Sequence, residues 1–64
     1  MDVAAVRTLM RRQIKKTGSQ TQWAKQIGEL RQTVSAIMLE QREPSKRVLD
    51  ALGLERVTEY RKVR

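Results

Sequence analysis

The sequence contains no cysteine and no histidine. Without cysteine no disulfide can form, and without either residue the usual zinc ligands are missing, which excludes a zinc finger. The same absences remove two common catalytic groups, the imidazole base and the thiolate nucleophile. The seven acidic residues show no pairing beyond that of surface helices. We therefore expect neither an enzyme nor a metal ion or other cofactor.

Long apolar stretches are missing as well. No run approaches the roughly 20 residues of a membrane span, and no charged-then-apolar leader precedes a small-residue cleavage site. We therefore expect a soluble intracellular protein with no membrane partner. A chain of 64 residues allows one small domain. Such a domain buries only about 60% of the surface of its unfolded chain, so a partner subunit or DNA would supply part of its stability.

Negative charge is scarce relative to positive charge. Fourteen lysines and arginines stand against seven acidic residues, which gives a net charge of +7 and an isoelectric point near 10.9. A domain with an isoelectric point above about 9 has the electrostatic character of a nucleic-acid binder. The solubility needs of a small protein, or a basic helix on a membrane surface, would explain the same excess. Charge alone does not decide between these alternatives.

The first part of the chain predicts a helix that stops at Gly18. Asp2 is a good N-cap, and Val6 and Ile14 belong to an apolar face at helical spacing. The opposite face is basic and holds Arg7, Arg11, Arg12, Lys15 and Lys16. Glycine is the expected stop because it tolerates the left-handed backbone that commonly ends a helix.

Residues 20–39 carry the most informative pattern. Ala24 is small where a second helix would cross the first, and Gly28 permits the turn between them. Val34 and Ile37 then lie three residues apart on the inner face of the second helix. Two short helices that cross through a turn of three or four residues need these features in this order, as in helix-turn-helix DNA-binding proteins.

Capping and stop residues divide the middle of the chain into three helices. Ser19 and Gln22 form a capping box for the first of them, and Pro44 cannot continue a helix. Trp23 is expected in the core rather than stacked on DNA. The three helices are expected at residues 20–27, from about 31 to 39 or 40, and at 46–52.

Two further short patterns extend the match to a known family. Pro44-Ser45 opens the last expected helix, and Leu52-Gly53-Leu54 closes it. Together with Ala24, Gly28, Val34 and Ile37, these two patterns make residues 6–54 resemble the lambda-repressor-like family. That family includes the Cro-type and repressor-type regulators of phages and prophages. The resemblance implies an all-α fold over residues 1–54, a four-helix DNA-binding domain with a helix-turn-helix. The small size and basic tail look most like a phage Cro-type protein.

The resemblance also implies roles for individual residues. In the family, the second helix of the motif lies in the major groove, and its N-terminal residues read base edges. The matching positions here are Arg31, Gln32, Ser35 and Ala36. Phosphate contacts are implied for Gln20, Gln41, Arg42, Lys46 and Arg47.

Side-chain chemistry agrees with these roles. Arginine can bond guanine O6 and N7 with both arms, glutamine can do the same to adenine N6 and N7, and alanine can pack on a thymine methyl group. Lysine and arginine neutralise phosphates. Each base-contacting position also has a plainer interpretation, as a solvated surface residue or, for Ala36, as a good helix former on an exposed face.

One position departs from the family pattern. The residue after the turn glycine is usually apolar and is followed by a Ser, Thr or Gly that caps the next helix, but Glu29 and Leu30 occupy these places here. Leucine is a poor N-cap and glutamate disfavours burial. A turn shifted by one residue, with Leu30 in the core and Glu29 exposed, would resolve the conflict. It would also move the register of Arg31 and Gln32.

The helical pattern is lost after Leu54. Residues 55–64 carry β-forming side chains among charges, so this candidate dimerisation segment would form either a short strand or a helix. As a strand, it would pair with its symmetry mate. The dimer-interface residues are then Leu54, Val57, Tyr60 and Val63, although Tyr60 would equally cover the edge of the core.

These observations favour a sequence-specific transcriptional regulator that binds double-stranded operator DNA as a homodimer, with no small-molecule effector evident. The alternative is an antitoxin-type or other protein-interaction module of the same fold, for which only residues 55–64 are free to bind a toxin. A non-specific coating protein would fit the charge but would leave the ordered motif unexplained.

Overall fold

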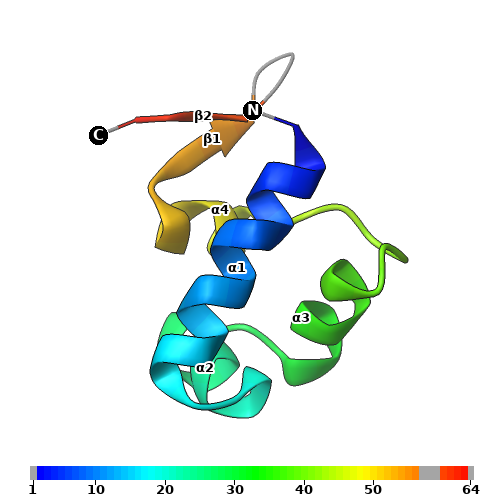
Figure 1. The fold of residues 1–64 in the computed structure, drawn as a ribbon, viewed down its shortest axis with the longest axis vertical. Helices are drawn as coiled ribbons and strands as arrows, with labels where there is room; N and C mark the ends of the chain where they lie inside the picture. The colour runs from blue at the N-terminus through cyan, green and yellow to red at the C-terminus, as the bar shows by residue number, and fades with distance from the viewer. Residues whose placement is uncertain (1, 57–59, 64) are drawn as a thin grey trace.

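The structure is a computed structural model that describes residues 2–56 and 60–63. Within these residues it contains four helices and a two-stranded antiparallel sheet (Figure 1). The elements are α1 (Val3–Thr17), α2 (Gln20–Ile27), α3 (Arg31–Met38), α4 (Lys46–Leu52), β1 (Leu54–Arg56) and β2 (Tyr60–Lys62). The four predicted helices are therefore confirmed.

Side-chain caps fix the starts of three helices. Asp2, Ser19 and Ser45 each accept a hydrogen bond from a backbone N–H in the first turn of α1, α2 and α4. Gly28 and Gly53 follow α2 and α4 in the left-handed conformation, with φ of 76° and 70°. These ends agree with the sequence, because local hydrogen bonds and backbone freedom determine them.

The limits of α3 differ slightly from the expected ones. The helix begins at Arg31 as expected, but it ends at Met38, ahead of the predicted Leu39 or Glu40. Glu40 adopts a left-handed backbone with φ of 62°. The N–H of Gln41 then donates to the carbonyl of Ala36 at 2.9 Å, which closes the last turn and directs the chain toward α4.

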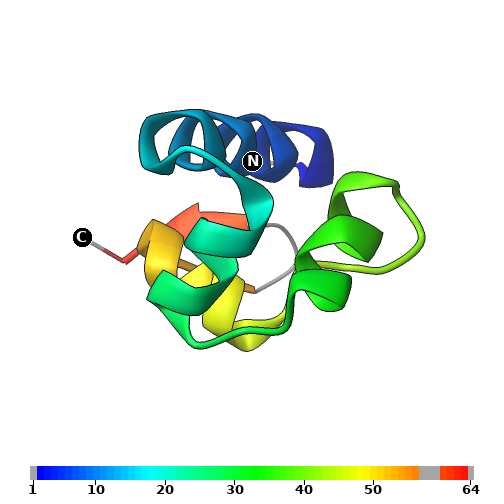
Figure 2. The ribbon, with the colours of Figure 1, turned by 90° about the horizontal axis from the view of Figure 1, so that it is seen from below.

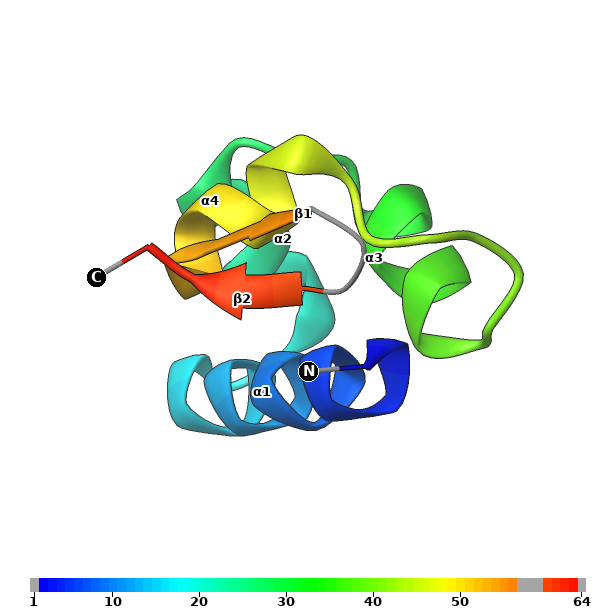
Figure 3. The same ribbon diagram turned by 90° about the horizontal axis from the view of Figure 1, so that it is seen from above.

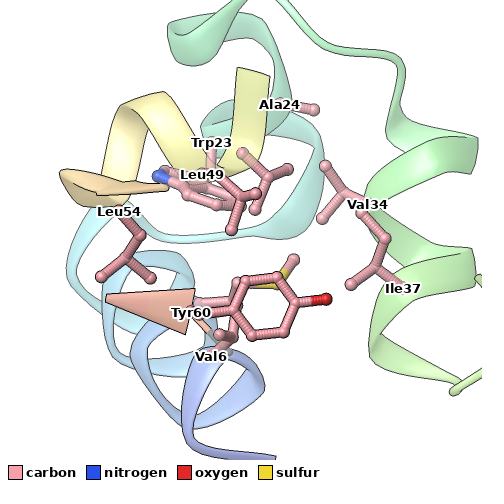
Figure 4. Close-up of a cluster of buried hydrophobic side chains, with 10 residues drawn as sticks. Val6, Trp23, Ala24, Val34, Ile37, Leu49, Leu54 and Tyr60 are labelled. Carbon is pink, nitrogen blue, oxygen red and sulfur yellow. The ribbon is translucent and has the colours of Figure 1, made fainter. Parts of the chain in front are cut away.

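One apolar core contains side chains from all six elements, and Figure 4 shows these buried side chains meeting in one cluster. Trp23 is 2% exposed, so its predicted place in the core is confirmed. Ala24 is also fully enclosed. The buried apolar residues are Val6, Met10, Trp23, Ala24, Val34, Ile37, Val48, Leu49, Leu54 and Tyr60.

The C-terminal segment forms strands rather than a helix. β1 and β2 pair with each other in the register Leu54↔Lys62 and Arg56↔Tyr60. This register puts Leu54 and Tyr60 on one face of the sheet, where they are 2% and 7% exposed. Both therefore belong to the protein's own core. For Tyr60 this is the second of its two expected roles, whereas Leu54 was expected at the dimer interface and has little exposed surface for that contact.

The other two residues of the predicted dimer interface differ from this pair. Val63 is 53% exposed, and its N–H donates to the carbonyl of Gly53 at 3.0 Å. Val57 lies outside the described residues. Of the predicted interface, Val63 is the described residue that presents apolar surface to solvent.

The elements place α3 at the side of the molecule. In Figure 3 the two strands lie between α1 and α4, and α3 lies beside them. Figure 2 shows α3 and the loop that follows it forming one edge of the molecule. α3 packs on α2 and α1, so one of its faces is left to solvent. None of the described helices is both long enough and apolar enough to cross a membrane.

Candidate nucleic-acid interface

α3 has a buried face and a solvent face. Its inner residues Thr33, Val34 and Ile37 are buried. The residues predicted to contact bases lie away from this face: Arg31 and Gln32 are exposed, and Ser35 and Ala36 are half-buried. The structure therefore brings the four predicted base-contacting residues together on one short helix.

The turn before α3 corrects one sequence-based expectation. Leu30 is 67% exposed rather than in the core, and Glu29 is half-buried rather than exposed. Glu29 tolerates this position because its carboxylate has two polar partners: it accepts from the Leu30 N–H at 3.0 Å and from the Ser45 hydroxyl at 2.8 Å. The Ser45 oxygen in turn accepts from the Val48 N–H at 3.3 Å. The helix still starts at Arg31, so the register is not shifted.

Glu29 is held in its ionised form. The Leu30 N–H and the Ser45 hydroxyl lower the pKa of its carboxyl, and the charges of Arg47 and Arg42 act in the same direction, while partial burial opposes them. Hydrogen bonds to a carboxylate favour its charged state. The ionised carboxylate thus ties the start of α3 to the start of α4.

The predicted phosphate-contacting residues lie on three segments: the start of α2, the loop after α3 and the start of α4. Arg42 extends from the loop after α3, and its guanidinium donates to the Thr33 hydroxyl at 3.4 Å. Gln20 is half-buried at the first position of α2. The exposed members of the set are Gln41, Arg42, Lys46 and Arg47.

Two of these cations border a hollow next to the turn. An open cavity of about 730 Å³ lies between α2 and α4, and Lys46, Arg47 and Gln26 are among its lining residues. A Cβ at Gly28 would lie only 2.9 Å from a guanidinium nitrogen of Arg47, so that side chain reaches across the turn between α2 and α3. Arg47 therefore places positive charge beside the turn that leads into α3, while Lys46 shares the lining of the cavity with Asp50.

Sequence reasoning missed the role of Arg7. This side chain of α1 donates from Nε to the carbonyl of Ile37 at 2.8 Å and lies 3.7 Å from the Glu40 carboxylate. It is 13% exposed, so it does not belong to the solvated basic face that the helical pattern assigned to it. A cation at the C-terminal end of a helix is stabilising, because the carbonyl groups there lack partners. Nothing in the local pattern distinguishes Arg7 from its neighbouring arginines.

The site presents cationic and hydrogen-bonding side chains. The residues that the structure describes hold no group of acidic side chains suited to a metal ion. Comparison with protein families, curated proteins and solved structures finds no match to this chain. The solvent face of α3 presents an arginine and a glutamine in its first turn, with Arg42 bonded to Thr33 of the same helix and Arg47 beside the preceding turn. Such a surface is complementary to a polyanion with hydrogen-bonding groups inside a groove.

Proposed function

We propose that this protein is a sequence-specific, DNA-binding transcriptional regulator of the lambda-repressor-like, Cro-type kind, which binds its operator as a homodimer. In this proposal α2 and α3 form a helix-turn-helix, and α3 enters the major groove with its N-terminal end leading. The observation that carries the proposal is the exposure of Arg31 and Gln32 in the first turn of α3.

Base reading follows from these two side chains. Arginine recognises guanine, and glutamine recognises adenine, through paired hydrogen bonds to major-groove edges. Each such pair contributes about 1–3 kcal/mol of discrimination against the wrong base. Ser35 and Ala36 lie one turn further along the same helix, where a hydroxyl and a methyl group have shorter reach.

Phosphate binding follows from the surrounding cations. Arg42, Lys46 and Arg47 are exposed on the loop after α3 and at the start of α4. Each phosphate that a cation neutralises releases counterions from DNA, so affinity falls with salt in proportion to the number of such contacts. The net charge of +7 favours this sequence-independent part of binding.

Dimerisation follows from the size of the reading element. α3 has eight residues, and a single helix of this kind reads too few base pairs for a specific site in a genome. Two copies related by a two-fold axis would read half-sites about one helical turn apart. We assign the C-terminal segment to this contact, because Val63 is exposed and a two-stranded sheet leaves strand edges to which a second copy can pair.

Selection from random duplex DNA tests the proposal. The purified protein should enrich a palindromic sequence with half-sites about one helical turn apart. Equal retention of all sequences would instead indicate a non-specific coating protein. No retention of DNA at low salt would reject nucleic-acid binding, and co-purification with another gene product would then favour the protein-interaction alternative.

A further inference from the structure

Leu30 occupies a position where the other helices carry a polar cap. Asp2, Ser19 and Ser45 stand immediately before α1, α2 and α4, and each accepts a backbone hydrogen bond through its side chain. Leu30 stands immediately before α3 and makes no such bond. A leucine there leaves first-turn N–H groups of α3 without a side-chain cap, which disfavours the helix.

The leucine side chain lies outside the apolar core. Leu30 is 67% exposed, and its own backbone N–H is bonded to the Glu29 carboxylate, a contact that any non-proline residue would make. A single exposed leucine is common and carries no information by itself. The informative feature is its place, directly before Arg31 and Gln32. A residue that breaks a local rule without benefit to the fold is expected to serve function.

The surroundings of Leu30 favour DNA as its partner. Exposed cations lie near this side chain: Arg31 follows it directly, and the charges of Arg47 and Arg42 act on the carboxylate of Glu29, which precedes it. Their charge complements phosphates on both sides of a groove. Leucine has no donor or acceptor, and the apolar group that base edges present in the major groove is the C5 methyl of thymine.

We propose that Leu30 is a specificity-determining residue that packs against the C5 methyl group of a thymine where α3 enters the major groove. The inference rests on the proposed function and adds an apolar contact to the polar ones of the same interface. Burial of one methyl group changes affinity about four-fold, and two symmetric half-sites would give about fifteen-fold.

The test replaces thymine by deoxyuridine, one position at a time in both half-sites of the selected operator. This change removes only the C5 methyl group and leaves base pairing intact. For the wild-type protein, fluorescence anisotropy should show about a fifteen-fold rise in Kd at one symmetric pair of positions. Leu30→Ala should bind the thymine operator more weakly, and deoxyuridine at that pair should then cause no further loss.

Leu39 supplies a matched control. It is 64% exposed, close to the value for Leu30, but it follows the opposite end of α3. Leu39→Ala removes the same apolar side chain from the other end of α3 and should keep the full deoxyuridine penalty. Leu30→Ser serves as a second variant, because serine caps helices. It should melt at a higher temperature than the wild type and still lose the discrimination between thymine and deoxyuridine.

The outcomes separate the inference from the function on which it rests. An enriched operator with no thymine in its half-sites would overturn the inference and leave the regulator proposal standing. The same holds if Leu30→Ala and Leu30→Ser retain the wild-type deoxyuridine penalty, or if Leu39→Ala loses it instead. Failure to enrich any sequence would overturn the proposed function itself, and the inference with it.

Discussion

Glu29 and Ser45 lie 16 residues apart in the sequence and are joined by a hydrogen bond of 2.8 Å between the carboxylate and the hydroxyl. Glu29 belongs to the turn before α3, and Ser45 is the N-cap of α4. Their contact therefore couples the orientation of the exposed helix to that of the helix that carries Lys46 and Arg47. A change at either residue should affect both the stability of the fold and the geometry of the interface.

The lowered pKa of Glu29 predicts a pH-dependent contribution to stability. Because folding stabilises the ionised form, the contribution is fully present above the unfolded pKa of about 4.5 and is lost as the pH falls through the lower folded value. Glu29→Gln should lower the free energy of unfolding by about 1 kcal/mol at neutral pH. Urea denaturation should show this difference shrinking as the pH falls below the unfolded pKa.

Glu43→Gln is the matched control for this experiment. Glu43 pairs with Arg56, and the two side chains are 63% and 59% exposed. Exposed pairs contribute about 0–1 kcal/mol, so this variant should change stability little at any pH. If Glu29→Gln lowers the free energy of unfolding as much in acid as at neutral pH, the assigned role of the carboxylate is contradicted.

The proposed interface predicts two different kinds of DNA-binding defect. Arg31→Ala should cost about 1–3 kcal/mol on the selected operator and relax the preference at one base pair, because it removes a base contact. Lys46→Ala should weaken binding to all sequences alike and reduce the slope of log K against log salt, because it removes a phosphate contact. Titrations of the operator and of a random duplex at several salt concentrations measure the loss of affinity on each duplex and the slope of log K against log salt. Equal losses on the two duplexes for Arg31→Ala would exclude its role in base reading.

The helices were predictable because their signals are local. The caps Asp2, Ser19 and Ser45 act within one turn of their own helices, and Gly28 ends α2 through its own backbone conformation. Apolar spacing likewise identified the buried side of each helix. The outward placement of Arg31 and Gln32 follows from the same periodicity.

The misassigned residues depend on contacts between distant segments. Glu29 is satisfied by Ser45, a partner 16 residues away that a local pattern cannot reveal. Arg7 bonds to Ile37, 30 residues away in the sequence. Tyr60 enters the core only because β2 pairs with β1 inside one chain. The local pattern of β-forming residues is the same whether a strand pairs within its own chain or with a second copy.

Ala24 tests the packing between α2 and its neighbours. Its side chain is 1% exposed in the core, so Ala24→Leu should force extra volume into a filled space and cost about 1–3 kcal/mol. In a domain of this size that is a large share of total stability, and thermal melts should show it clearly. Ala4→Leu adds the same atoms to an exposed position of α1 and should leave the melt nearly unchanged. Equal melting of both variants would exclude the close packing at Ala24.

Tyr60 and Val63 test whether folding and dimerisation can be separated. Tyr60 lies in the core, so Tyr60→Ala should destabilise the monomer by about 3–5 kcal/mol, comparable to other large aromatic truncations. Val63 is exposed, so Val63→Asp should change the free energy of unfolding, measured by thermal melting, by less than about 0.5 kcal/mol. Under the homodimer proposal, Val63→Asp should nevertheless raise the concentration at which sedimentation velocity detects dimers, since a charge would be buried at the contact. If Val63→Asp dimerises like the wild type, the dimer interface does not lie in the C-terminal segment. If Tyr60→Ala melts like the wild type, Tyr60 is not in the core and the position of β2 is wrong.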